Sequence, residues 1–308
     1  MLEMIFSLQT LEAAFRIATP LLLAALGGAL THKAGIFNIG LEGMMLASAF
    51  ASVAVSYSTS SWVLGVLAGA ATGLLAGLVF GAFTIDFRTD SIIVGTALNL
   101  LSLGATTYLL RAMFDVRAGL QSERIESIPD LHLPILEKLG FLNVFNNQSL
   151  FTYLSWILIA VLWFVVYHSP FGLHLRAAGE NPEVLGAAGI RLRRVRYLAA
   201  IGCGALCGLA GTHLALGYLH QFVINITGGQ GFIALAAVQF GQGNPAAIFA
   251  GTLLFGVADS VSTSLQVGGV PGYFSLMIPY VATIVALTVV AIRNKRKTKA
   301  AIVLKAGD

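Results

Sequence analysis

Apolar runs of about 20 residues recur along almost the whole chain, and no other feature limits its possible folds as strongly. A helix needs roughly 20 apolar residues to cross the hydrocarbon core of a bilayer. Hydrophobic residues make up 57% of the 308 positions and charged residues only 10%, whereas a water-soluble domain of this size needs far more charge to cover its surface. The sequence therefore predicts an all-α polytopic membrane protein.

The apolar runs give nine candidate membrane spans, within an expected range of about 8 to 10 transmembrane helices. Two candidates are short and flanked by glycine, so we expect broken or re-entrant segments there. No hydrophilic stretch is long enough to carry its own core, and residues 1–308 are predicted to form a single transmembrane domain. The candidates are 14–31, 40–57, 62–84, 92–112, 150–168, 197–219, 229–241, 245–266 and 273–292, of which 40–57 and 229–241 are the short ones.

The distribution of charge orients these spans. Basic loops beside membrane spans stay on the cytoplasmic side, so loop 169–196 and the basic tail 293–308 are predicted to be cytoplasmic. The stretch 113–149 has three basic against five acidic residues and is predicted to be an extracytoplasmic loop, with a short amphipathic helix around 135–142. Nine spans then place the N-terminus outside, where no cleaved signal peptide is expected.

The basic loop 169–196 contains the signals of a short helix. Asn181 is a favourable N-cap residue, and Pro182 fits the first helical position. Glu183 suits the positive end of the helix dipole, and Gly189 is able to end the helix. The loop is therefore predicted to present a short, rigid helix, supported by a span on each side, to a cytoplasmic partner.

Two polar, glycine-bearing segments interrupt the apolar pattern: 35–45 (GIFNIGLEGMM) and 225–234 (NITGGQGFIA). A broken helix exposes amide and carbonyl groups that lipid does not satisfy, so such breaks lie against protein or a water-filled cavity, and transporters hold solute at such places. The alternative is an ordinary capped helix end at the membrane interface. The residues predicted to line a solute path are Asn38, Glu42, Asn99, Thr227, Gln230 and Gln239.

Glu42 and Asp259 are the acidic residues most clearly within spans. A carboxylate inside the membrane is costly and is by default a functional hypothesis. For Glu42 a structural role is the alternative, because the start of a helix stabilises an anion through its dipole and free amide groups. For Asn99 and Gln239 the alternative to solute contact is an interhelical hydrogen bond.

The sequence has no motif for an enzymatic reaction. It contains neither a G-x-x-x-x-G-K-[ST] phosphate loop nor H-E-x-x-H, and its six histidines are scattered. We therefore predict no catalytic residue, no metal site and no cofactor in this chain. The net charge of +4 belongs to segments beside the membrane and does not indicate nucleic-acid binding. Cys203 and Cys207 are predicted to be small core-facing residues and not a disulfide.

Glycine occupies every fourth position of 62–84, from Gly65 to Gly81. Stripes of small residues let helix backbones approach closely in lipid. We expect tight helix packing here, with a sliding surface for a conformational change as the alternative.

Three segments resemble those of permease subunits of ABC importers for nucleosides and simple sugars, the branched-chain amino acid and ribose type. Residues 33–45 (KAGIFNIGLEGMM) are similar to a segment typical of the nucleoside branch. Residues 178–190 (AGENPEVLGAAGI) resemble the coupling segment, which sugar and branched-chain amino acid permeases share. Residues 229–238 (GQGFIALAAV) are similar to a third segment. The resemblance covers nearly the whole chain.

The resemblance implies a multi-pass subunit of a bacterial cytoplasmic membrane transporter. It implies a cytoplasmic ATP-binding subunit, which would hold the ATP and magnesium, a second permease subunit, identical or different, and an extracytoplasmic solute-binding lipoprotein. The helix after Asn181 would sit in a groove of the ATPase and transmit its closure to the spans. The residues assigned to this coupling are Glu180, Asn181, Pro182, Glu183, Leu185, Gly189 and Arg191.

A stand-alone secondary transporter or channel for a small polar solute is the main alternative, and a membrane-embedded enzyme is a third. The missing ATP motif fits both kinds of transporter. The rigid basic loop favours the importer subunit, because a stand-alone carrier needs no docking helix and usually shows charges for ion coupling inside the membrane. Side chains of Asn, Gln and Thr suit ribose hydroxyls and base edges alike, so the sequence leaves nucleoside and sugar open.

Overall fold

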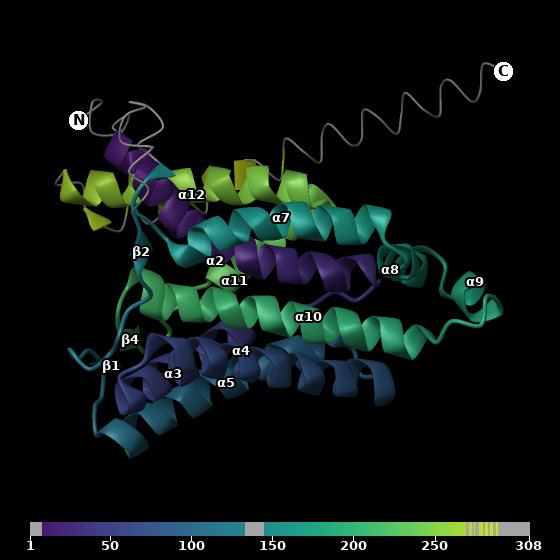
Figure 1. Cartoon of the computed structure of the whole chain (residues 1–308), viewed down its shortest axis with the longest axis horizontal. Helices are drawn as coiled ribbons and strands as arrows, with labels where there is room; N and C mark the ends of the chain where they lie inside the picture. The colour runs from purple at the N-terminus through teal and green to yellow at the C-terminus, as the bar shows by residue number, and fades with distance from the viewer. Residues whose placement is uncertain are drawn as a thin grey trace.

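The computed structural model describes residues 8–132 and 145–268, together with scattered positions between 271 and 288. These residues form a bundle of long helices that lie side by side (Figure 1). The helices are α2 (Leu8–Lys33), α3 (Leu41–Thr59), α4 (Trp62–Gly81), α5 (Ser91–Phe114), α7 (Leu150–His168), α8 (Pro170–Glu180), α9 (Pro182–Ala187), α10 (Leu192–Thr212), α11 (Gln230–Gly241) and α12 (Pro245–Val267).

Two π-helical turns and two short strand pairs complete the described part of the chain. The π-helical turns Ala82–Asp86 and His213–Tyr218 extend α4 and α10. Strand β1 (Gly119–Leu120) pairs antiparallel with β4 (Phe222–Val223), and β2 (Asp130–Leu131) pairs antiparallel with β3 (Gln148–Ser149).

Six helices among the described residues are long and apolar enough to cross a membrane. They correspond to six of the predicted spans, and α3 and α11 lie at the two predicted short ones, so the all-α polytopic fold with broken segments is confirmed. The predicted helix 135–142, the tail 293–308 and much of the span 273–292 lie outside the described residues. The six spans are Thr10–Lys33, Trp62–Asp86, Ser91–Phe114, Leu150–His168, Leu192–Tyr218 and Pro245–Gln266.

Helix α2 occupies the centre of the bundle. Of its most apolar window, 89% is buried, against 22% for α5 and for α7. Its sequence is apolar all round, which is typical of a helix surrounded by other helices, and α10, α11 and α12 all pack against it. The outer helices keep broad apolar faces exposed, as lipid-facing helices do.

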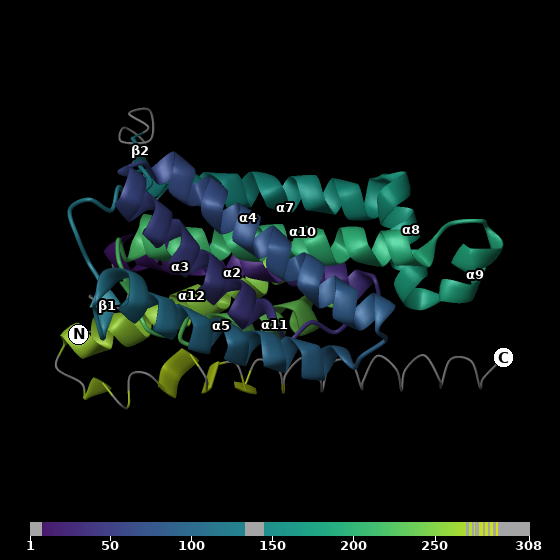
Figure 2. The ribbon, with the colours of Figure 1, turned by 90° about the horizontal axis from the view of Figure 1, so that it is seen from below.

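The two ends of the bundle differ in chemistry. One end carries α8 and α9, and we call it the basic end because loop 169–196 with its five arginines lies there. The opposite end carries the strand pairs, and we call it the strand end (Figure 2). The described part of 113–149 and the loop 169–196 therefore lie at opposite ends, as the charge pattern requires.

The glycine stripe of α4 brings three backbones together. All five of its glycines are buried. A methyl group added at Gly73 would overlap the carbonyl oxygen of Gly204 in α10, and one at Gly77 would overlap the carbonyl oxygen of Ala200. One at Gly65 would lie 2.8 Å from the carbonyl oxygen of Ser52 in α3. The expectation of tight packing is confirmed, because α4 approaches α10 and α3 at backbone distance.

We expect Gly73→Ala to lower the melting temperature of the protein in detergent, measured by size-exclusion chromatography after heating. Overpacking of a fitted contact costs ~1–3 kcal/mol. Gly104→Ala in α5 is the matched control, because no atom lies within 4 Å of the added carbon. The control should leave the melting temperature unchanged or raise it, since alanine favours a helix over glycine by roughly 0.5–1 kcal/mol. Equal melting temperatures for the two variants would contradict the close approach.

Candidate functional site

Helices α3 and α11 begin inside the bundle, and their first turns meet there. Each follows one of the glycine-bearing segments that the sequence marks as a break. The first turn of α3 also touches α5 at Asn99, the ninth residue of that helix. At 1.5 Å per residue the meeting point therefore lies about 12 Å along α5 from the basic end. We call this place the junction of the two half-helices.

Glu42 connects the two half-helices through its carboxylate. Its Oε1 accepts hydrogen bonds from the Thr227 hydroxyl at 2.5 Å and from the Gly229 amide at 2.9 Å. Its Oε2 accepts from the Gly231 amide at 2.6 Å. The side chain is 6% exposed. An anion that accepts two amide protons at the start of α11 satisfies donors left over by the broken helix and is stabilised by the helix dipole.

Two asparagine side chains satisfy the break before α3. Asn99 Oδ1 accepts from the Gly43 amide at 2.7 Å, and its Nδ2 donates to the Ile39 carbonyl at 3.1 Å. Asn38 Oδ1 accepts from the Gly40 amide at 2.8 Å. These bonds supply protein partners for backbone groups that lipid does not satisfy, as a broken helix in a membrane requires.

Asn38 also links the junction to α10, because its Nδ2 lies 3.4 Å from Cys203 Sγ. Both Cys203 and Cys207 are buried free thiols, as the sequence predicts for small core-facing residues. The sequence analysis did not predict the contact between Asn38 and Cys203, because the two residues are 165 positions apart in the chain.

The structure brings four of the predicted path residues into the hydrogen bonds of the junction, places Gln230 beside them in the first turn of α11, and leaves Gln239 on the surface of α11. The four have protein partners for their polar groups, which for Glu42 favours the structural alternative that the sequence left open. Gln230 is half-buried, and its Oε1 atom is buried without a hydrogen-bond partner among the described residues, whereas Gln239 is exposed near the basic end. Solute contact by any of the six stays a prediction. The four at the junction are Asn38, Glu42, Asn99 and Thr227.

Asp259, the second acid within a span, is half-buried on α12. It forms no ion pair with any residue that the structure describes. It is not among the hydrogen-bond partners of Glu42, which are Thr227, Gly229 and Gly231.

Helix α9 is built as the sequence predicts. Asn181 Oδ1 accepts from the Val184 amide at 3.4 Å, and Pro182 occupies the start of the helix. Gly189 takes a φ of +76°, a conformation that glycine adopts without strain. The Ile190 amide donates to the Leu185 carbonyl at 3.1 Å and closes the end of the helix.

Leu185 anchors α9, and the rest of this helix faces outward. The Leu185 side chain is 3% exposed and belongs to the hydrophobic core, whereas Val184 is 59% exposed. Helix α9 extends beyond the ends of the neighbouring helices (Figure 2). The other residues assigned to coupling are exposed, except the half-buried Pro182: Glu180, Asn181, Glu183, Gly189 and Arg191.

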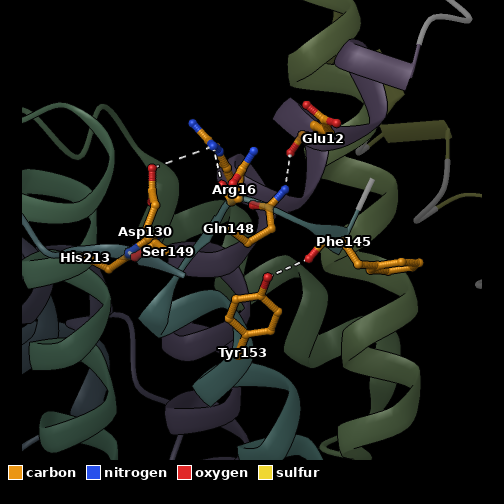
Figure 3. A network of polar contacts seen from close by, with 9 residues as sticks. Glu12, Arg16, Asp130, Phe145, Gln148, Ser149, Tyr153 and His213 are labelled. Carbon is orange, nitrogen blue, oxygen red and sulfur yellow. Dashed lines mark hydrogen bonds and ion pairs between the residues drawn. The ribbon is translucent and has the colours of Figure 1, made fainter. Parts of the chain in front are cut away.

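A polar network closes the strand end, and sequence reasoning missed it. Arg16 of α2 forms an ion pair with Asp130 at 3.8 Å (Figure 3). It also donates a hydrogen bond to the Asn147 carbonyl. Ser149 Oγ and His213 Nδ1 lie 3.5 Å apart, so the same loop also meets the end of α10 (Figure 3). Arg16 and Asn147 are separated by 131 positions, and no local pattern signals such a pairing.

The comparisons with known proteins fit this geometry. Residues 10–287 match the family described as the permease component of branched-chain amino acid transport systems, and the chain belongs to this family. It is therefore a permease subunit of an ABC transporter and a multi-pass protein of the cytoplasmic membrane, which works with an ATP-binding partner. The stand-alone carrier and the membrane-embedded enzyme are not favoured.

Three curated relatives cover most of the chain. It is 35% identical to the guanosine ABC transporter permease NupQ of Bacillus subtilis, over 88% of both chains. It is 33% identical to the nucleoside ABC transporter permease NupC of Lactococcus lactis, also over 88% of both. It is 34% identical to a candidate glucose ABC transporter permease, TsgC13 of Haloferax volcanii, over 85% of this chain and 79% of that one.

One solved structure shares the fold. A chain from an inward-facing metal-chelate type ABC transporter superposes with a TM-score of 0.52 at 15% identity, and the match covers 93% of this chain and 88% of that one. At this identity the likeness concerns the fold alone.

We expect Glu42→Gln to destabilise the protein more than it alters solute selectivity. The amide nitrogen of glutamine does not accept a hydrogen bond, so at least one buried donor at the start of α11 loses its partner, at a cost of ~1–3 kcal/mol. Thermal unfolding in detergent measures the loss. Glu123→Gln makes the same chemical change at an exposed site and should leave the melting temperature unchanged. A changed solute range together with wild-type stability would refute the structural role of Glu42.

Proposed function

We propose that this permease imports nucleosides and that the closure of its ATP-binding partner drives the movement. Two curated relatives named for guanosine and nucleoside transport support the substrate, at 35% and 33% identity over 88% of the chain. The Gln230 side chain, whose Oε1 atom has no hydrogen-bond partner among the described residues, carries an amide that suits ribose hydroxyls and base edges. The ATP and magnesium belong to the partner, and the work done on this chain is mechanical.

The projecting helix α9 carries the proposal for coupling. It is short, capped at both ends, anchored by Leu185 and exposed on its remaining faces. Residues of α8 and α10 contact it on either side. A force applied to α9 by a cytoplasmic ATPase therefore reaches α10 directly, and α10 reaches α4 through the glycine contacts.

The remaining partners follow from the same proposal. The basic end is the cytoplasmic end and receives the ATP-binding subunit. The strand end faces outward and receives solute from an extracytoplasmic lipoprotein. A second permease subunit, identical or different, packs beside this one in the membrane.

A hexose is the second candidate for the solute. The relative with a glucose assignment matches this chain at 34% identity, nearly as closely as the guanosine permease. Ribose and glucose present similar hydroxyl groups, so the two candidates differ mainly in the base.

Replacement of Asn181, Pro182 and Glu183 by three glycines is expected to abolish ATP-dependent uptake into proteoliposomes of the complete transporter. The change removes the cap and the start of α9, while Leu185 and the spans stay intact. Asn181→Ser is the matched control, because serine caps a helix about as well as asparagine, and it should retain uptake. Membrane insertion of both variants is followed by their yield in the membrane fraction. Wild-type uptake by the triple-glycine variant would contradict the coupling role.

Labelled guanosine and labelled glucose, offered separately to the same proteoliposomes, test the solute. We expect ATP-dependent accumulation of guanosine and competition by unlabelled nucleosides but not by glucose. Accumulation of glucose and not of guanosine would show that the transported solute is a hexose and not a nucleoside. Uptake of either solute without the ATP-binding subunit would contradict the proposed mechanism.

A further inference from the structure

An open groove of about 780 Å³ lies at the basic end, between the end of α4 and the start of α10. Its polar lining comes from Asp86 and Arg88 on one side and from Arg193 and Arg196 on the other. None of these residues belongs to the junction or to α9, and the proposed function leaves them without a role.

One of the three arginines holds the groove together. Arg193 pairs with Asp86 through two contacts of 2.7 Å, from Nε to Oδ1 and from Nη2 to Oδ2. The Tyr197 hydroxyl donates a third hydrogen bond to Asp86 Oδ2, also at 2.7 Å. The carboxylate is thus fully engaged, and the two helix ends are fixed relative to each other.

The other two arginines leave the groove positively charged. Arg88 and Arg196 take part in no ion pair with any described residue. Arg196 donates one N–H, from Nε, to the Ala34 carbonyl at 3.4 Å, and its terminal N–H groups are left for another acceptor. Three guanidinium groups against one carboxylate give an excess of two positive charges. Guanidinium groups match the geometry of phosphate oxygens and bind them in pairs.

An apolar groove adjoins the charged one. It has a volume of about 380 Å³ and shares Arg193, and its other lining residues are Arg194, Tyr197 and Leu198. The Arg193 guanidinium lies 5.6 Å from the centre of the Tyr197 ring. Leu198, one position further along α10, is 54% exposed. A ligand that occupies both grooves must therefore combine an anionic group with an apolar chain.

The depth of the two grooves points to the same ligand. Asp86 is the last residue of one membrane span and Leu192 is the first residue of another, so the charged groove lies where hydrocarbon gives way to headgroups. The exposed side chains of Phe87 and Leu198 flank it. Basic pockets between helices at this level bind anionic lipid headgroups.

We propose that this pair of grooves is a binding site for an anionic phospholipid. Arg88 and Arg196 bind the phosphate, and the acyl chain lies along Tyr197 and Leu198. Arg193 pairs with Asp86 and so holds the two sides of the charged groove together. The bound lipid contacts both the end of α4 and the start of α10, close to the segment that connects α9 to α10. An acidic surface of a cytoplasmic protein is the competing occupant, and the exposed apolar side chains at this depth favour lipid.

Native mass spectrometry of the purified full-length chain, released from nanodiscs, tests the site. The probes are phosphatidylglycerol and phosphatidylcholine with identical acyl chains. The test variant is Arg88→Gln with Arg196→Gln, which leaves the bond from Arg193 to Asp86 intact. Arg111→Gln with Arg117→Gln is the matched control, because both arginines are exposed at the strand end and the change in charge is the same.

We expect the wild-type chain to retain phosphatidylglycerol in preference to phosphatidylcholine. The test variant should bind phosphatidylglycerol roughly ten-fold or more weakly, as expected for the loss of two basic side chains beside an anionic lipid, while the control stays within about two-fold of the wild type. Thermal unfolding must be unchanged in both variants. If the test variant unfolds, Leu198→Gln is used in its place. This variant should weaken the retention of phosphatidylglycerol, because only the contact with the acyl chain is lost.

Three results would overturn the proposal. The first is equal retention of phosphatidylglycerol by the test variant and the wild type. The second is displacement of the lipid by inorganic phosphate alone, which would indicate a simple phosphate site. The third is wild-type lipid retention with impaired co-purification of the ATP-binding subunit, which would assign the groove to a protein partner. The first two results do not bear on nucleoside uptake, and the third concerns a protein contact away from α9, so a failure of this proposal stays distinguishable from a failure of the proposed function.

Discussion

Two helices that begin inside a bilayer leave their first amide groups without partners, and the middle of this bundle depends on the side chains that supply the missing acceptors. Asn38 and Asn99 serve α3, and Glu42 serves α11. A carboxylate is costly in hydrocarbon, but the start of a helix is the place where that cost is offset. Because Glu42 belongs to α3 and accepts from α11, the same interaction fixes the two half-helices to each other.

The sequence predicts the parts of this arrangement that depend on local patterns. Apolar runs locate the spans, the order Asn181, Pro182 and Gly189 locates α9, and glycine-bearing polar segments locate the breaks. Each of these signals depends on residues that are close together in the sequence, because backbone preferences and helix capping act over short distances along the chain. The spacing of the glycines in 62–84 likewise predicts tight helix packing.

The sequence does not predict which partner each of these groups takes. Glu42 and the Gly229 amide are 187 positions apart, and Arg16 and the Asn147 carbonyl are 131 apart. A carboxylate at the start of a helix is compatible with solute, with its own helix or with a distant one, and only the packing of the whole bundle selects among them. For the same reason the glycine stripe indicates close approach without naming α10 as the neighbour.

Backbone atoms of α4 and α10 approach each other directly at Gly73 and Gly77, and this limits how the two helices pack. Glycine has no side-chain torsions to order, so its burial costs no rotamer entropy. Two surfaces of this kind pack without selecting among alternative side-chain arrangements at the glycine positions. A helix contact of this kind has one well-defined arrangement, which suits a transporter that passes through the same conformational cycle many times.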